Sequence, residues 1–302
     1  GSKSSDNEGQ VLFYESDDMK KWKYLSKFSL PNMGEMWECP DFFEIDDKSI
    51  MIFSPINKET ENLKFQNSNP NVYIIGKFNY NTGEFKEEYI GELDSGFDFY
   101  APQTLIDLKG RIIMMAWANT WEKEQIPKRK SLGWNGIMTF PRKVTLSNNK
   151  LMLMPVSEID FYFKEVYSIN NILEITNPVD ENIKTFKDKK SGRINFKISN
   201  TEKENIIHLC TKEDNKISIY LSKSKLCIEK KSELEHLKRE LELAENMKEI
   251  LEFDILIDNS IIEIFINNGE ISFTSKLFFE YNSIIDFEII NGIISDITIY
   301  YN

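Results

Sequence analysis

The 302-residue sequence has little histidine and cysteine: two histidines and three cysteines. His208 and His236 are too few for a multi-histidine metal site. Cys39, Cys210 and Cys227 lack the spacing of metal ligands, and an odd number makes a poor disulfide framework. No apolar run approaches the roughly 20 residues that a membrane-spanning helix needs. We therefore expect no metal, no cofactor and no membrane partner.

A basic face is also missing. The formal net charge is -12, which argues against nucleic acid as a partner. Hydrophobic residues make up 41% of the chain and aromatic residues 13%, as expected for a folded globular protein. The length allows one large domain or two ordinary ones.

Helical periodicity is scarce, and short β-rich runs such as VLFY, SIMIFS, NVYIIGKF and RIIMMAW recur instead. Turn residues separate these runs, for example Asn81-Thr82-Gly83. This alternation of short strands and turns predicts an all-β protein.

An internal repeat underlies the strands. With a shift of 62 positions, residues 38–54 (ECPDFFEIDDKSIMIFS) align with residues 100–116 (YAPQTLIDLKGRIIMMA). Residues 72–78 align with residues 134–140, and residues 10–28 resemble a weaker third copy of the outer hairpin. Repeated units of about four strands indicate the blades of a β-propeller.

The repeat makes Glu38 and Tyr100 equivalent positions, each two residues before a proline. We expect both side chains to face one funnel at an end of the propeller channel. The apolar neighbours Trp37, Cys39 and Phe42 predict partial burial of Glu38, and burial favours the protonated form that a general acid needs. The alternative is a solvated loop carboxylate.

Four motifs occur in order, namely WECPD, DFYAPQT, GRIIMMAWANTW and GIMTFPRKVTL, and a long hairpin pattern follows at residues 253–279. This series resembles glycoside hydrolase family 32, which includes invertases, sucrose-6-phosphate hydrolases, levanases and inulinases. The resemblance implies a five-bladed propeller followed by a β-sandwich. It also implies retaining hydrolysis of β-fructofuranosidic bonds without a cofactor.

The resemblance further implies roles for individual residues. Glu38 would be the general acid/base, and Cys39 follows it in the same motif among the substrate-binding residues. Tyr100 and Trp117 would line the fructose site, and Asp94 would lie near the glycosidic oxygen. Simple core packing remains the alternative for Trp117, and a turn beside Gly96 remains the alternative for Asp94. Trp121 and Asn119 are weaker candidates, and Glu263 is expected on a solvated strand face.

The sequence departs from the family where the nucleophile is concerned. The family's nucleophile is an Asp in a W-M-N-D-P-N-G motif, and a second Asp lies in an R-D-P motif. This sequence contains no Asp-Pro dipeptide, and the similar stretch at residues 67–71 has Asn69 at the Asp position, so a loop is expected there. Residues 1–22 fit the family stretch that follows R-D-P. We therefore expect the C-terminal portion of a family member, beginning inside blade two and inactive by itself.

The predicted organisation is a partial propeller at residues 1–150, a linker at 151–165 and a β-sandwich at 166–302. Residues 232–250 favour a helix on propensity, but their position in the family favours strands. A hairpin turn is expected at Asn267-Asn268-Gly269.

Two functional classes remain open. The first is a β-fructofuranosidase that acts on sucrose or sucrose 6-phosphate, with fructan as a further alternative. The second is a non-catalytic carbohydrate-binding relative. A phosphorylated sugar would suit a basic rim such as Lys128-Arg129-Lys130, although a solvated loop is the commoner meaning of such a run. A bacterial sucrose-6-phosphate hydrolase would be cytoplasmic, in agreement with unpaired cysteines, and secretion remains the alternative. A saccharide is the expected partner, and the oligomeric state stays open.

Overall fold

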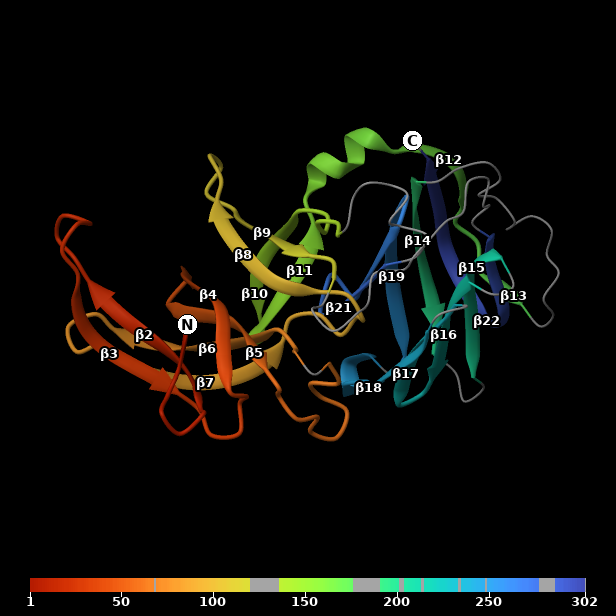
Figure 1. Ribbon diagram of the computed structural model, residues 1–302. Coiled ribbons are helices and arrows are strands. Elements are labelled where there is room, and N and C mark those ends of the chain that lie inside the picture. Colours follow the sequence, from red (N-terminus) through yellow and green to blue (C-terminus); the bar gives the residue numbers. More distant parts are fainter. Residues whose placement is uncertain are drawn as a thin grey trace.

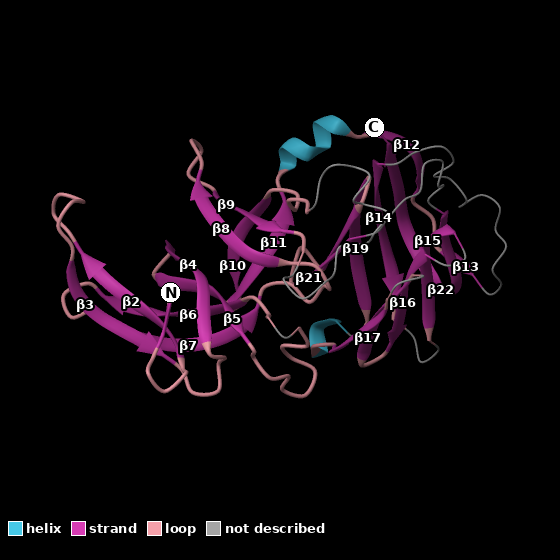
Figure 2. Cartoon of the chain, in the orientation of Figure 1, coloured by secondary structure: helices cyan, strands magenta, loops and turns pink. Residues whose placement is uncertain are grey.

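The computed structural model describes residues 1–67, 69–119, 136–175, 191–200, 204–212, 215–232, 235–247, 249–276 and 286–301. Within these ranges nearly all regular structure is β-strand, and the helical pieces are the short 3-10 turns η2 (Ser157–Tyr162) and η4 (Glu245–Met247) (Figure 2). The all-β prediction is confirmed. None of the helices in these ranges has the length and apolar character needed to cross a membrane.

Three antiparallel sheets form the N-terminal half and stand next to one another as blades (Figure 1). The first has the order β1-β2-β3, the second β4-β5-β6-β7 and the third β11-β10-β9-β8. Their strands are β1 (Ser2–Lys3), β2 (Gly9–Glu15), β3 (Lys23–Ser29), β4 (Met36–Ile45), β5 (Lys48–Ile56), β6 (Val72–Asn79), β7 (Glu84–Glu92), β8 (Tyr100–Ile106), β9 (Ile112–Trp117), β10 (Arg142–Ser147) and β11 (Lys150–Pro155).

Apolar side chains fill the spaces between neighbouring blades. Trp37 of β4 is completely buried and stacks on Phe53 of β5, with ring centroids 3.9 Å apart. Its indole Nε1 donates a 2.7 Å hydrogen bond to the carbonyl of Met33, so the polar edge of the ring is satisfied. Burial of each such ring stabilises the blades by roughly 1.5–3 kcal/mol. Trp37 thereby fixes the strand that carries its neighbour Glu38.

The 62-residue repeat is visible in the backbone. β4 and β8 each contain a register shift, between Glu38 and Asp41 in one and between Tyr100 and Gln103 in the other. The predicted alignment of residues 72–78 with 134–140 does not hold. Within the described part of that segment only Met138 pairs with β9, as an isolated bridge, and the third strand is β10, which starts at Arg142. Pro141 lacks an N–H for the ladder, so regular pairing resumes only after it.

The C-terminal half is a β-sandwich whose two sheets share the long strand β22. The first part of β22 pairs with β15 and the second part with β14, which carries the chain from one sheet to the other. Isoleucine, leucine and phenylalanine side chains from both sheets form one buried core. The strands are β12 (Lys164–Ile169), β13 (Leu173–Ile175), β14 (Ser191–Ser199), β15 (Asn205–Lys212), β16 (Asn215–Ser222), β17 (Lys225–Lys231), β18 (His236–Glu242), β19 (Ile250–Asp258), β20 (Ile261–Ile266), β21 (Ile271–Lys276) and β22 (Asp286–Tyr301).

Two sequence expectations about this half can be compared with the structure. Residues 236–242 of the stretch 232–250 form β18, which pairs along its length with β17, so tertiary pairing overrides the helical propensity there. The β20–β21 hairpin turns at Asn267 and Asn268, which have φ of 51° and 56°, followed by Gly269. Both expectations are confirmed.

The connection between the halves begins later than expected. β11 runs to Pro155 and pairs with β10, whereas the sequence placed the start of a linker at residue 151. Leu151 and Leu153 are buried in the blade core, which explains why the strand continues. The 3-10 turn η2 then leads across to β12 at Lys164 (Figure 1).

Candidate active site

Glu38 and Tyr100 lie together at the start of adjacent strands. The Tyr100 hydroxyl donates a 2.5 Å hydrogen bond to Oε2 of Glu38. Tyr100 is 1% exposed, whereas Glu38 is only partly buried, so the carboxyl group keeps access to solvent. The repeat thus correctly brings the two side chains together, and their facing one funnel of the propeller channel stays a prediction.

Two further bonds join β4 to β8. The Gln103 amide donates to the carbonyl of Cys39 at 2.9 Å, and the Thr104 N–H donates to Oδ2 of Asp41 at 2.8 Å. The other oxygen of Asp41 accepts the N–H of Phe42 at 2.9 Å. Asp41 and Gln103 had no predicted role, although the repeat places each of them three residues after a site position. Their hydrogen bonds set the distance between the strands and therefore between Glu38 and Tyr100.

The backbone is unusual directly after each site residue. Cys39 has φ of 48° and Ala101 has φ of 50°, in the left-handed region that side chains with a Cβ avoid. Each such residue costs about 1–2 kcal/mol, and conformations of this kind concentrate at functional sites. Partial burial and the Glu38 carboxylate raise the pKa of the Cys39 thiol. The thiol is therefore protonated at neutral pH and is a poor nucleophile.

Trp117 contacts Tyr100 and is the third residue of the candidate site. It is the register partner of Tyr100 across β8 and β9, and the two rings meet edge to face with centroids 6.5 Å apart. The indole is partly exposed, so it is not simply part of the core. Gly136 packs against it so closely that a Cβ there would lie 2.4 Å from Nε1. The structure thus brings Glu38, Tyr100 and Trp117 together, and contact with a sugar stays a prediction.

Asp94 lies elsewhere, in the contact between the two halves of the protein. Its side chain is fully buried and receives Nη1 of Arg142 at 2.8 Å and the Thr274 hydroxyl at 2.7 Å. It also accepts the N–H of Gly96 at 2.8 Å, which agrees with the alternative prediction that Asp94 forms a turn beside Gly96. The structure therefore does not place Asp94 with the other site residues, and its contact with substrate stays a prediction.

Glu263 corrects a sequence expectation. It was expected on a solvated strand face, but its side chain is completely buried. Oε2 accepts Nε and Nη2 of Arg142 at 2.9 and 2.6 Å, and Oε1 accepts the N–H of Phe140 at 2.6 Å. Burial raises the pKa of Glu263 even though Arg142 opposes that shift. Polar alternation along β20 misled the prediction because its partner, Arg142, is 121 residues away.

Further predictions from the sequence concern Trp121, a basic run, Asn119 and Asn69. Trp121 and Lys128-Arg129-Lys130 lie outside the described residues. Asn119 is buried, and its side-chain oxygen accepts Nζ of Lys276 from the sandwich. Asn69 lies in a loop, as expected, and its side-chain oxygen accepts the N–H of Asn57 at 3.2 Å. In the described ranges no three His, Cys, Asp or Glu side chains gather in a way that could hold a metal ion.

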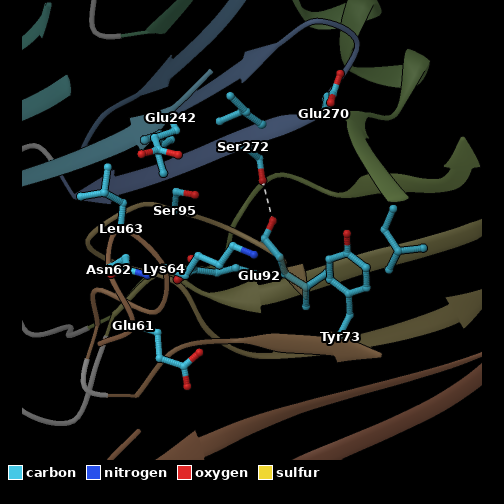
Figure 3. Close-up of a pocket in the computed structure, with 15 residues that line it drawn as sticks. Glu61, Asn62, Leu63, Lys64, Tyr73, Glu92, Ser95, Glu242, Glu270 and Ser272 are labelled. Atoms are coloured by element: carbon cyan, nitrogen blue, oxygen red, sulfur yellow. Dashed lines mark hydrogen bonds between the residues drawn. The ribbon is translucent and has the colours of Figure 1, made fainter. Parts of the chain in front are cut away.

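A separate cavity of about 550 Å³ lies between the halves of the protein (Figure 3). Its lining includes Glu61, Lys64 and Glu92 from the propeller and Glu242 and Glu270 from the sandwich. It contains none of the residues of the Glu38 site, so the candidate active site is the Glu38, Tyr100 and Trp117 group.

Comparisons with known proteins agree along the whole chain. Residues 1–155 match the glycosyl hydrolases family 32 N-terminal domain, and residues 155–300 match the family 32 C-terminal region. A sucrose-6-phosphate hydrolase of Vibrio alginolyticus is 31% identical over 291 residues, which are 93% of this chain and 56% of that protein. A sucrose-6-phosphate hydrolase of Bacillus subtilis (strain 168) is 28% identical over 294 residues, 92% of this chain and 58% of that protein.

Solved structures give the same result for the fold. A family 32 β-fructofuranosidase of Bombyx mori is 26% identical with a TM-score of 0.79, and the match covers 99% of this chain and 61% of that one. A mutant of the same enzyme was solved in complex with sucrose, with a TM-score of 0.77 and 27% identity, over 98% of this chain and 61% of that one. The chain thus spans less than two thirds of the length of these relatives.

Proposed function

This chain belongs to glycoside hydrolase family 32, and from that premise we propose that it supplies the acid/base part of a retaining β-fructofuranosidase site. The observation that carries the proposal is the hydrogen bond between Tyr100 and Glu38 at the equivalent bulges of two neighbouring blades. The bond ties a partly exposed carboxyl group to a rigid strand. A general acid needs that combination of access and fixed position.

Glu38 would give its proton to the glycosidic oxygen as the bond from fructose to the leaving group breaks. A second carboxylate, about 5–5.5 Å away, would form the fructosyl ester on the other face of the sugar. Glu38 would then accept a proton from the water that attacks this ester, which releases fructose and restores both groups. Tyr100 would orient Glu38, Trp117 would pack against the fructose ring, and Cys39 would shape the edge of the site.

The second carboxylate is the part for which these 302 residues offer no family motif. Asp41 uses both oxygens for main-chain hydrogen bonds, and Asp94 is enclosed by Arg142 and Thr274. This supports the second candidate, a carbohydrate-binding relative without hydrolytic activity. We favour the hydrolase because the acid/base group is held in place by a dedicated hydrogen bond.

Sucrose and sucrose 6-phosphate are the substrates that we propose. Support comes from the names of the Vibrio and Bacillus relatives and from the sucrose complex of the Bombyx enzyme. Asp94 remains a proposed substrate residue only if its buried contacts rearrange. A cytoplasmic location accords with a phosphorylated substrate, and we propose it on that basis.

The test is a chimera in which this chain replaces the matched 291-residue segment of the Vibrio alginolyticus relative. We expect the chimera to release fructose from sucrose or sucrose 6-phosphate, and the 302-residue chain by itself to release none. Glu38→Gln should remove most turnover and change substrate binding little, because an amide cannot donate the proton.

Glu44→Gln is the matched control, because Glu44 lies on the same strand with an exposed side chain. It should leave turnover unchanged. A folded chimera that binds sucrose but releases no fructose would favour the carbohydrate-binding alternative. Turnover that survives Glu38→Gln would remove Glu38 from its proposed role.

A further inference from the structure

The segment that leads into Tyr100 is bound to the sandwich along its length. The N–H groups of Ser95 and Asp98 donate to the carbonyls of Ser272 and Thr274 of β21, at 2.9 and 3.1 Å. In return, the N–H of Thr274 donates to Oδ1 of Asp94 at 2.9 Å, and the N–H of Lys276 donates to Oδ2 of Asp98 at 2.9 Å. Residues 94–98 therefore follow β21 as an irregular extra strand.

Buried charge fixes the beginning of this segment. Arg142 is 0% exposed and lies between the rings of Phe99 and Phe265, 4.9 Å from each centroid. It bridges Asp94 of the segment to Glu263 of the sandwich. The Thr274 hydroxyl donates to Asp94 and accepts Nη2 of Arg142 at 2.5 Å. A buried ion pair of this kind holds only when its groups keep their hydrogen bonds.

Aromatic side chains fix the register of the segment. Phe97 is buried in the sandwich core and meets Phe273 edge to face, with centroids 5.0 Å apart. Phe99, two residues later, is buried in the propeller core. A shift of one residue would turn each side chain to the wrong face. The chain thus reaches Tyr100, the first residue of β8, with its register already set.

We infer that Thr274 and Arg142 are positioning residues of the site, through which the sandwich places the Tyr100 hydroxyl against Glu38. This inference rests on the proposed function for its catalytic meaning. A functional hydrogen bond must be held within about 0.5 Å of its productive geometry. The propeller holds this segment through Asn71, whose side chain donates to the carbonyl of Phe99 at 2.6 Å and whose carbonyl accepts the N–H of Leu93. It also holds the segment through Asn67, whose side chain donates to the carbonyl of Gly96 at 2.7 Å. β21 supplies the main-chain contacts at Ser95 and Asp98.

The test uses NMR on the 302-residue chain labelled with ¹³Cζ-tyrosine, with Tyr100→Phe to assign the Tyr100 signal. Because Tyr100 donates to the Glu38 carboxyl group, its signal should shift when Glu38→Gln replaces that acceptor with an amide, and we call this shift the Tyr100 step. We expect the step to be lost in a Thr274→Val background, which keeps the shape and removes the hydroxyl, and to return with Thr274→Ser.

Ser218→Ala is the matched control, since Ser218 is a buried sandwich hydroxyl that bonds His208 far from β21. It should keep the Tyr100 step. A folded Thr274→Val protein with an unchanged step would overturn the inference, and so would an equal loss in Ser218→Ala. If Thr274→Val does not fold, Ser272→Ala carries the test, because the Ser272 hydroxyl donates to the carbonyl of Leu93 at 2.8 Å (Figure 3). A reduced step in that variant supports the inference and an unchanged step overturns it.

Different experimental results would refute the hydrolase function and the positioning role. An inactive chimera would count against the hydrolase function, while the NMR step in the isolated chain would still report on positioning. An active chimera together with an unchanged step in Thr274→Val would refute the positioning role alone.

Discussion

The Tyr100 hydroxyl donates to Glu38 over 2.5 Å although the two residues are 62 positions apart in the sequence. A separation of 62 positions also holds for Cys39 and Ala101, which directly follow these two residues and have positive φ. The same backbone feature, a bulge at the start of the first strand of a blade, thus occurs in two neighbouring blades. It carries the Glu38 carboxyl group in one copy and the Tyr100 hydroxyl in the other, and the two groups meet.

Tyr100→Phe tests the value of this contact in the chimera. The ring and its packing remain, while Glu38 loses the donor that holds it. We expect kcat to fall by about tenfold with a smaller change in KM, because one positioning hydrogen bond contributes about 1–1.5 kcal/mol. Steady-state kinetics on sucrose provide the measurement.

Tyr80→Phe is the control for that variant. Tyr80 donates to Glu44 at 2.8 Å, which is also a tyrosine–glutamate bond, but it lies on the surface. Its loss should leave kcat unchanged. Equal effects of the two substitutions would mean that the Tyr100 bond has no special role.

Much of the fold was predictable because its signals are local or repetitive. Alternating strands, turn residues and a 62-residue repeat indicate blades, and the family motifs add the sandwich. The repeat also predicted the meeting of Glu38 and Tyr100. It failed within residues 136–140, the described part of the predicted third strand, because Pro141 delays that strand to Arg142.

The contact between the halves could not be predicted in the same way. A glutamate on an alternating strand usually faces water, so Glu263 was placed there, and Asp94 was assigned to the substrate from its motif. Both carboxylates accept hydrogen bonds from Arg142, which lies 48 residues from Asp94 and 121 from Glu263. Local periodicity does not report on which charges meet across a domain boundary.

A double-mutant cycle on Arg142 and Glu263 tests this cluster. Arg142→Met should lower the free energy of unfolding by about 3–5 kcal/mol, because it leaves two carboxylates buried without a cation. Glu263→Gln in the same protein should recover part of that loss by removing one of the charges. Urea unfolding of the two single variants and the double variant gives the coupling energy.

Arg111→Met is the comparison for the cycle. Arg111 also pairs with two carboxylates, Asp107 and Glu158, but near the surface. Its loss should cost about 1 kcal/mol or less. Additive losses from Arg142→Met and Glu263→Gln would show that the buried groups do not depend on one another.

Ala101→Gly tests backbone strain beside the site. Glycine relieves a left-handed cost of about 1–2 kcal/mol and adds roughly 0.5–1 kcal/mol of unfolded-state entropy. We therefore expect unchanged stability, or a gain of up to about 1.5 kcal/mol, in urea unfolding. Ala116→Gly, at a buried alanine of β9, should instead destabilise the protein. A clear loss of stability in Ala101→Gly would argue against strain at this position.

Glu92 gives the contact between the halves a pH dependence. Its side chain lines the cavity in Figure 3, accepts the N–H of Phe65 at 3.2 Å and lies near Lys64, Asp94 and Arg239. Burial raises its pKa from 4.5 to about 7. Between these values the folded protein binds more protons at this group than the unfolded chain does. The contribution of Glu92 to stability is thus fully present below about pH 4.5 and is lost as the pH rises to about 7.

Glu92→Gln removes this titration and keeps a side-chain oxygen for the N–H of Phe65. Its stability relative to the unmodified protein should therefore rise between about pH 5 and about pH 8 in urea unfolding. Glu84→Gln, on the exposed first residue of the same strand, should show a difference that does not change with pH. A constant difference for Glu92→Gln as well would mean that the carboxyl group ionises in the folded protein as it does in the unfolded chain. The wall of the cavity would then hold Glu92 charged across this pH range without loss of stability.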